Sequence, residues 1–154
     1  PPKKKMMKNE PKAYEILEHT ADIGIRVFAK DINGLFCNAA YGMCDLIAGK
    51  KGSGRVQPGG GSTNIDIEVC ASDREELLIA WLSELLTHID ARTLMFTDFK
   101  ILELTAHKLR ARATAEALTP DSYDLKTEIK AVTYHQIQLQ RQGDTMRAEV
   151  FFDV

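Results

Sequence analysis

The sequence predicts an α+β fold in a single domain, with one largely antiparallel or mixed sheet and two helices packed on one face. Two long helical patterns are separated by several strand-like runs, without the regular strand-helix alternation that indicates a parallel sheet. The length of 154 residues suits one core, since a domain of about this size buries roughly 70% of its unfolded surface. The formal net charge of −2 excludes binding to nucleic acid or lipid through overall positive charge.

Residues 1–12 are rich in lysine and proline, and we expect them to form a disordered tail ahead of a domain over residues 13–154. The tail has no apolar segment of the signal-peptide type, and no run in the chain approaches the ~18 apolar residues of a membrane helix. We therefore expect a cytoplasmic protein, or a nuclear and cytoplasmic one in a eukaryote, without a membrane partner.

Two apolar runs, Tyr14 to Leu17 and Ile23 to Phe28, predict strands joined by a tight turn at Glu18-His19-Thr20-Ala21-Asp22. Asp31 then fits the N-cap of a helix over about Ile32 to Ala48. Apolar residues recur in that segment three and four positions apart, which predicts one buried face.

Six of the fourteen residues 49–62 are glycine, which predicts that the helix ends there and a flexible glycine-rich loop follows. The next segment, Thr63 to Cys70, alternates apolar and polar residues and predicts a strand with one solvated face. Ser72 and Glu75 fit a capping box at the start of a second helix. Its broad apolar face, from Leu77 to Ile89, predicts that this helix lies at the centre of the core.

Two β-hairpins are predicted for the rest of the chain. The first pairs about Phe96 to Leu104 with Lys108 to Ala117, and the second pairs Thr127 to Gln140 with Thr145 to Asp153. A bulge is expected at residues 131–132, where apolar residues stop alternating with polar ones.

A row of basic side chains lies on one face of the predicted strand Lys108 to Ala117. It consists of Lys108, Arg110 and Arg112. Such a row is either a solvated face or a patch that contacts phosphate groups, and the sequence leaves both interpretations open.

Carboxylate groups lie at the ends of two predicted strands. Asp22 precedes a strand, Asp153 ends one, and Val154 carries a main-chain carboxylate. If the first hairpin and the last strand are neighbours, these three anions converge, and a divalent cation would relieve their repulsion. Oxygen ligands favour Mg²⁺, Ca²⁺ or Mn²⁺ over zinc.

Local hydrogen bonding offers a different explanation for the same turn. His19 either adds a nitrogen ligand or caps the turn together with Thr20. Asp22 either binds metal or accepts main-chain N–H groups. The residues themselves do not decide between these alternatives.

The known catalytic signatures that we sought are not present in the sequence. It contains no G-x-S-x-G, no HExxH, no EF-hand loop and no dinucleotide-binding fingerprint. An enzyme of one of those classes is therefore not indicated.

Four blocks of the sequence resemble the archease family, and the resemblance spans roughly residues 13–154. The blocks are Tyr14-Glu15-Ile16-Leu17-Glu18-His19-Thr20-Ala21-Asp22-Ile23-Gly24, Trp81-Leu82-Ser83-Glu84-Leu85-Leu86, Lys126-Thr127-Glu128-Ile129-Lys130-Ala131-Val132-Thr133-Tyr134-His135 and Phe152-Asp153-Val154. They occur in the family's order, and only the tail and the glycine-rich loop lie outside the resemblance.

The resemblance implies a non-enzymatic accessory protein of the GTP-dependent RtcB-type RNA ligase. Such a protein promotes guanylylation of the ligase and its multiple turnover in tRNA splicing and RNA repair, and it meets RNA indirectly through the ligase. The resemblance places metal ligands at Asp22 and Asp153 beside the carboxylate of Val154, and a functional lysine at Lys130. His19 and Thr20 are further candidates for functional or partner-contacting residues.

Two other functions remain open at this point. A metal-dependent phosphoesterase would use the same carboxylates to activate water. A chaperone-like modulator of a tRNA methyltransferase would need no metal.

Overall fold

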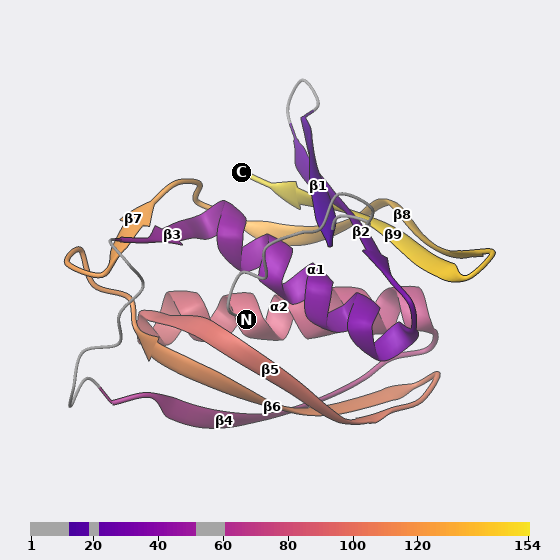
Figure 1. Cartoon of the computed structure of the whole chain (residues 1–154), viewed down its shortest axis with the longest axis horizontal. Helices are drawn as coiled ribbons and strands as arrows, with labels where there is room; N and C mark the ends of the chain where they lie inside the picture. Colours follow the sequence, from indigo (N-terminus) through magenta and orange to yellow (C-terminus); the bar gives the residue numbers. More distant parts are fainter. Residues whose placement is uncertain (1–12, 19–21, 52–60) are drawn as a thin grey trace.

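Two helices lie between two antiparallel sheets in the computed structural model, which describes residues 13–18, 22–51 and 61–154 (Figure 1). The first sheet has the strand order β1-β2-β9-β8 and the second has the order β4-β6-β5. A two-stranded ribbon, β3-β7, lies at one end of the molecule. The predicted tail, residues 1–12, lies outside the described residues.

The bounds of the elements follow the chain order. The strands are β1 (Tyr14–Glu18), β2 (Ile23–Ala29), β3 (Ala48–Lys50), β4 (Thr63–Cys70), β5 (Leu94–Leu104), β6 (Lys108–Ala117), β7 (Tyr123–Leu125), β8 (Ala131–Gln142) and β9 (Thr145–Asp153). The helices are α1 (Ile32–Ile47) and α2 (Arg74–Arg92).

The predicted α+β class is confirmed, with antiparallel strands and two helices in a single domain. The strands are divided among three sheets. Each helix packs against both of the larger sheets. Trp81 of α2 is fully buried, and its indole N–H donates to the carbonyl oxygen of Phe36 in α1 at 3.0 Å. This hydrogen bond joins the two helices in the middle layer.

The first helix begins as predicted and ends one residue early. The carboxylate of Asp31 accepts the N–H of Gly34 at 2.7 Å and caps the helix. Ala48, Gly49 and Lys50 then form β3, so the prediction of an irregular loop over residues 49–62 was wrong for its first two residues. Residues 52–60 of that loop lie outside the described part of the chain.

The capping box of the second helix was predicted one residue too early. Asp73, not Ser72, is the N-cap, and its carboxylate accepts the N–H of Glu76 at 2.8 Å. The carboxylate of Glu76 in turn accepts the N–H of Ser72 at 2.7 Å. Glu75 is used elsewhere, since it accepts the N–H of Leu139 on the edge strand β8 at 3.2 Å.

The second predicted hairpin begins later than expected, because β8 starts at Ala131 instead of Thr127. The N–H groups of Lys126 and Thr127 bond to the carbonyl oxygen of Ile47, at 2.8 and 3.4 Å, so this segment is attached to the end of α1. The register between β8 and β9 shifts between Thr133 and Gln138, and the predicted bulge at residues 131–132 was therefore misplaced.

Among the described residues, no helix combines the length and the apolar character needed to span a membrane.

Candidate functional site

The predicted ligands lie at adjacent positions of neighbouring strands. In the antiparallel pair β2-β9, Ile23 lies opposite Phe152, and continuing this register by one residue places Asp22 opposite Asp153. On the other side of β9, Ala131 lies opposite Asp153. Figure 1 shows the end of β9 beside the β1-β2 hairpin. The condition set by the sequence, that the first hairpin neighbours the last strand, is thus met.

The backbone of Lys130 lies beside Asp153, at the same end of the sheet. Its N–H donates to the carbonyl oxygen of Asp153 at 2.7 Å, which extends the β8-β9 pairing by one step beyond β8. Ile129, the preceding residue, is buried at 3% exposure and anchors the segment. We call the group of Asp22, Lys130, Asp153 and Val154 the carboxylate edge.

The carboxylate edge is open to solvent. Asp153 and Lys130 are exposed, Asp22 is half-buried, and Val154 is 42% exposed. Because Val150 and Phe152 point into the core, alternation along β9 puts Asp153 on the opposite face of the sheet, away from the helices. His19 and Thr20, the other predicted site residues, lie outside the described part of the chain.

Among the described residues, no cationic side chain pairs with Asp22 or Asp153. In the described ranges, neither Asp22 nor Asp153 takes part in a side-chain ion pair or hydrogen bond. Two unpaired carboxylates on neighbouring strands repel each other, and a cation relieves this repulsion. Their chemistry fits a hard divalent ion.

Two aspartates do not form a complete metal site by themselves. The described residues contain no group of three or more His, Cys, Asp or Glu side chains that could hold a metal ion. Ca²⁺ and Mg²⁺ also accept backbone carbonyl groups and water as ligands. Two aspartates with backbone carbonyl groups and water fit a partly hydrated, oxygen-bound cation, and the carboxylate predicted at Val154 stays a prediction.

An ion-pair network lies farther along β2 and β9 and extends to β1. Nε of Arg26 bonds Glu149 at 2.8 Å and its Nη1 bonds Glu15 at 3.3 Å, while Arg147 bonds Glu149 at 3.0 Å. We call these four residues the Arg26 network. Partial burial acts to raise the pKa of Glu149, but the hydrogen bonds and charges of the two arginines outweigh it and lower that pKa.

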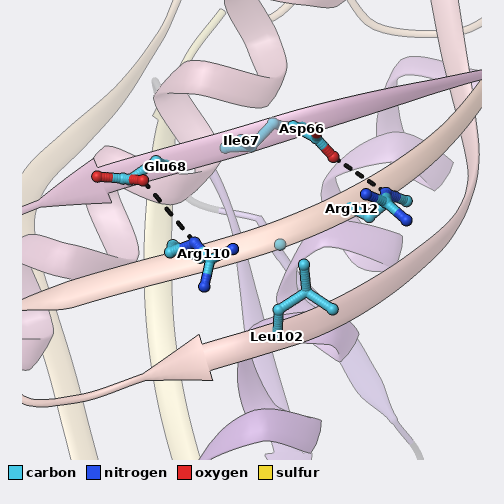
Figure 2. A pocket seen from close by; sticks show the side chains of 7 residues that line it. Asp66, Ile67, Glu68, Leu102, Arg110 and Arg112 are labelled. Carbon is cyan, nitrogen blue, oxygen red and sulfur yellow. Dashed lines mark hydrogen bonds and ion pairs between the residues drawn. The ribbon is translucent and has the colours of Figure 1, made fainter.

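The basic row on the second sheet is paired with carboxylates. Arg112 lies 3.0 Å from Asp66, and Arg110 lies 3.9 Å from Glu68, as Figure 2 shows. Arg110 also lies 3.5 Å from Glu103. These contacts favour the solvated face over a phosphate-binding patch, and each such exposed pair contributes only about 0 to 1 kcal/mol.

A polar cluster that the sequence did not indicate joins the ribbon to the second sheet. Glu116 of β6 accepts hydrogen bonds from the ammonium group of Lys50 and the hydroxyl of Tyr123. The ammonium nitrogen of Lys50 also lies 5.1 Å from the centroid of the Tyr123 ring. Burial and the bond to Glu116 raise the pKa of Tyr123. The cluster fixes β7, which leads directly into the segment carrying Lys130.

The sequence of this chain matches the model of the archease protein family over residues 14–154. It is 35% identical over 152 residues to protein archease of Methanosarcina acetivorans, and the match covers 96% of this chain and 100% of that protein. It is 36% identical over 134 residues to protein archease of Thermococcus kodakarensis, covering 85% of this chain and 90% of that protein.

Solved structures with the same fold are also found. The solution structure of Methanobacterium thermoautotrophicum protein 1598 matches with a TM-score of 0.65 at 25% identity, over 92% of this chain and 99% of that one. A Thermotoga maritima crystal structure, described as an archease and possible chaperone, matches with a TM-score of 0.61 at 18% identity, over 97% and 100% of the two chains. The latter similarity is one of fold.

Proposed function

This chain belongs to the archease protein family, and from that membership we propose that it activates a GTP-dependent RtcB-type RNA ligase without catalysing a reaction itself. It would promote guanylylation of the ligase and its multiple turnover in tRNA splicing and RNA repair, in the cytoplasm. The observation that carries the proposal is the strand register that brings Asp22, Asp153 and Lys130 together. RNA would be met through the ligase, and the paired basic row of the second sheet supports this.

In this proposal the carboxylate edge binds a divalent cation, Ca²⁺, Mg²⁺ or Mn²⁺, and presents it to the ligase. A cation bound there would neutralise phosphate oxygens of the nucleotide during guanylylation. Asp22 and Asp153 would hold the cation, with the carboxylate of Val154 as a further ligand. The exposure of Asp153 and Val154 supports access to a partner's pocket.

Lys130 has a separate part in the proposal. Its backbone N–H is fixed to Asp153, while its side chain is exposed, so the ammonium group is free to meet an anionic group of the partner or its nucleotide. An ammonium group on a flexible stem acts as a point charge toward phosphate. Lys130 would therefore add positive charge beside the bound cation.

The test is a guanylylation assay of the ligase with variants of this chain. Asp22→Asn and Asp153→Asn should each lower the stimulation by at least about tenfold, the effect expected when a metal site is disturbed. Lys130→Ala should lower it without changing the melting temperature. Asp90→Asn, at an exposed position on α2, is the matched control and should keep full stimulation.

The same preparations separate this proposal from the two alternatives. Hydrolysis of a cyclic phosphate by the purified chain alone, lost in Asp22→Asn, would identify a phosphoesterase. Stimulation that survives chelation of divalent ions and both aspartate variants would identify a chaperone-like role, which is how the Thermotoga maritima relative is described. Either result would contradict the proposed activation through a bound cation.

A further inference from the structure

We propose that the free edge of β1 binds the same edge of a second copy of this chain, which joins their two first sheets into one continuous antiparallel sheet. The copies would be related by a two-fold axis that passes beside Ile16. β1 is an outer strand of the first sheet, and Figure 1 shows it in the hairpin that projects from the body of the molecule. The inference goes beyond the proposed function and does not depend on a metal site.

The other outer strands of the two larger sheets carry features that oppose pairing with another chain. On β8, the N–H of Leu139 is already bonded to the carboxylate of Glu75 on α2, at 3.2 Å. β5 has two register shifts, and such irregularities protect sheet edges. On β4, a two-fold pairing centred on Ile67 would place Asp66 opposite Glu68 of the second copy, where like charges repel. Among the described residues, β1 has none of these three features.

The backbone of β1 directs its free hydrogen-bonding groups outward at three positions. The N–H of Phe28 donates to the carbonyl oxygen of Ala13 at 2.9 Å, so these two residues form a hydrogen-bonded pair at the start of the β1-β2 ladder. Such pairs alternate along an antiparallel ladder, and the register of β1 with β2 is unbroken. Every second residue from Ala13 onward therefore bonds to β2, and the N–H and carbonyl groups of Tyr14, Ile16 and Glu18 point to the open edge.

One two-fold register satisfies the outward groups at all three positions. If Ile16 lies opposite Ile16 of the second copy, Tyr14 of each copy lies opposite Glu18 of the other. All three positions then form hydrogen-bonded pairs, and each pair exchanges two main-chain bonds. The open edge is thus complementary to itself in this register.

The side chains of β1 suit the same register. The side chain of Ile16 is 53% exposed and would pack against its own copy at the axis. Both glutamates of β1 face uncharged residues, because Glu15 lies opposite Leu17 and Glu18 lies opposite a tyrosine. The charge of Glu15 is also compensated within its own copy, since Arg26 lies 3.3 Å from it.

Helix α1 covers only the start of β1. The ring of Tyr14 packs on Gly42 of α1, where an added Cβ atom would lie 3.2 Å from Cγ of the ring. The hydroxyl of Tyr14 donates to the carboxylate of Asp45 on the same helix. Farther along the strand, Ile16 and Glu18 lie on the same face as Tyr14 and are exposed. This part of the hairpin extends beyond the helix and is open to a second copy.

The short length of the contact sets the strength of the dimer. β1 has five residues, and pairing over that length buries less than the roughly 1,200 Å² of a stable interface. We therefore expect a reversible dimer, with a Kd between about 10 μM and 1 mM.

Sedimentation equilibrium of the purified full chain over that concentration range measures the association. Ile16→Lys places two lysines opposite each other at the axis and should weaken the dimer by about tenfold or more. The melting temperature should stay close to that of the wild type, because Ile16 is exposed. Leu125→Lys, the matched control at a 74% exposed residue of β7, should leave the association unchanged. A wild type that stays monomeric to about 1 mM, or a dimer that survives Ile16→Lys, overturns the proposal.

A mixture of two charged variants tests the register. Ile16→Glu should be monomeric for the same reason as Ile16→Lys, but an equimolar mixture of the two should associate, because opposite charges then meet at the axis. If both variants are folded and the mixture stays monomeric, the two-fold register centred on Ile16 is wrong.

Hydrogen exchange gives a measurement that needs no variant. The amides of Ile16 and Glu18 should exchange more slowly as the protein concentration rises, while those of Glu15 and Leu17, which bond to β2, should not change. Concentration-dependent protection of the β4 edge instead, for example at Asp66, would contradict the proposal. Protection of Ile16 and Glu18 that appears only when the ligase is added would show that the edge binds a strand of that protein, which overturns the dimer.

Discussion

At the scale of single residues, Thr93 holds an unfavourable backbone conformation. It follows α2 as the C-cap with φ 52 and ψ 52, and it is the one non-glycine residue with positive φ in the described part of the chain. A left-handed conformation costs roughly 1 to 2 kcal/mol for a residue with a Cβ atom. Glycine avoids most of that cost and is the usual residue at such a helix end.

Thr93→Gly should therefore stabilise the protein. We expect the free energy of unfolding to rise by about 1 kcal/mol, since the relief of strain exceeds the extra entropy that glycine gains in the unfolded chain. Thr93→Ala keeps a Cβ atom and should give a smaller change in the same urea-unfolding measurement. A loss of stability in Thr93→Gly would contradict this account of the helix end.

The lowered pKa of Glu149 makes stability depend on pH. A carboxyl group whose pKa is lowered by folding stabilises the native state above its ordinary value of 4.5, and this contribution is lost as the pH falls through the lower native value. The melting temperature should thus decline below about pH 4.5, and Glu149→Gln should reduce that decline. The exposed Glu128 gives the control, since Glu128→Gln should leave the profile unchanged.

At the scale of secondary-structure elements, the carboxylate of Glu116 joins the β3-β7 ribbon to the second sheet. Glu116 receives hydrogen bonds from Lys50 and Tyr123, and β7 leads into the segment that carries Lys130. Tyr123→Phe should lower the free energy of unfolding by about 1 kcal/mol, the usual net value of one hydrogen bond. It should also speed hydrogen exchange in the ribbon more than in α2.

The matched control for the ribbon is an exposed tyrosine. Tyr134 of β8 is 63% exposed, so Tyr134→Phe should change neither stability nor exchange. Equal effects of the two substitutions would show that the cluster around Glu116 does not hold the ribbon.

The helices and strands that could be predicted are those whose pattern of apolar and polar residues involves only residues close in sequence. The alternation in β4 and β6 and the apolar faces of both helices follow from residues close in sequence, and the predicted strand and helix types were confirmed. The start of β8 and the ribbon could not be predicted, because they depend on the carbonyl oxygen of Ile47 and on Glu116, which are distant in sequence. The capping box failed because Ser72 and Asp73 are both good caps.

The candidate site was predictable in part for the same reason. Asp22 and Asp153 stand out as carboxylates at strand ends, but their proximity depends on which strand pairs with β2. That choice is made by core packing across the whole sheet.

At the scale of the whole molecule, β2 near the start of the sequence pairs with β9 at its end in one sheet. A cation held between Asp22 and Asp153 would join these strands in the folded state only. Binding of this kind stabilises by about 2.7 kcal/mol at a ligand concentration one hundred times Kd. Mn²⁺ should therefore raise the melting temperature, chelation should reverse the rise, and Asp153→Asn should abolish it.

The most direct test of a cation site at the carboxylate edge is to locate bound Mn²⁺ on the purified chain by NMR. Paramagnetic broadening should appear first at the amides of Ile23, Lys130 and Asp153, and last at those of the second sheet, such as Arg110. Broadening centred instead on Asp66 and Glu68, or spread evenly over surface carboxylates, would contradict a cation site at the carboxylate edge.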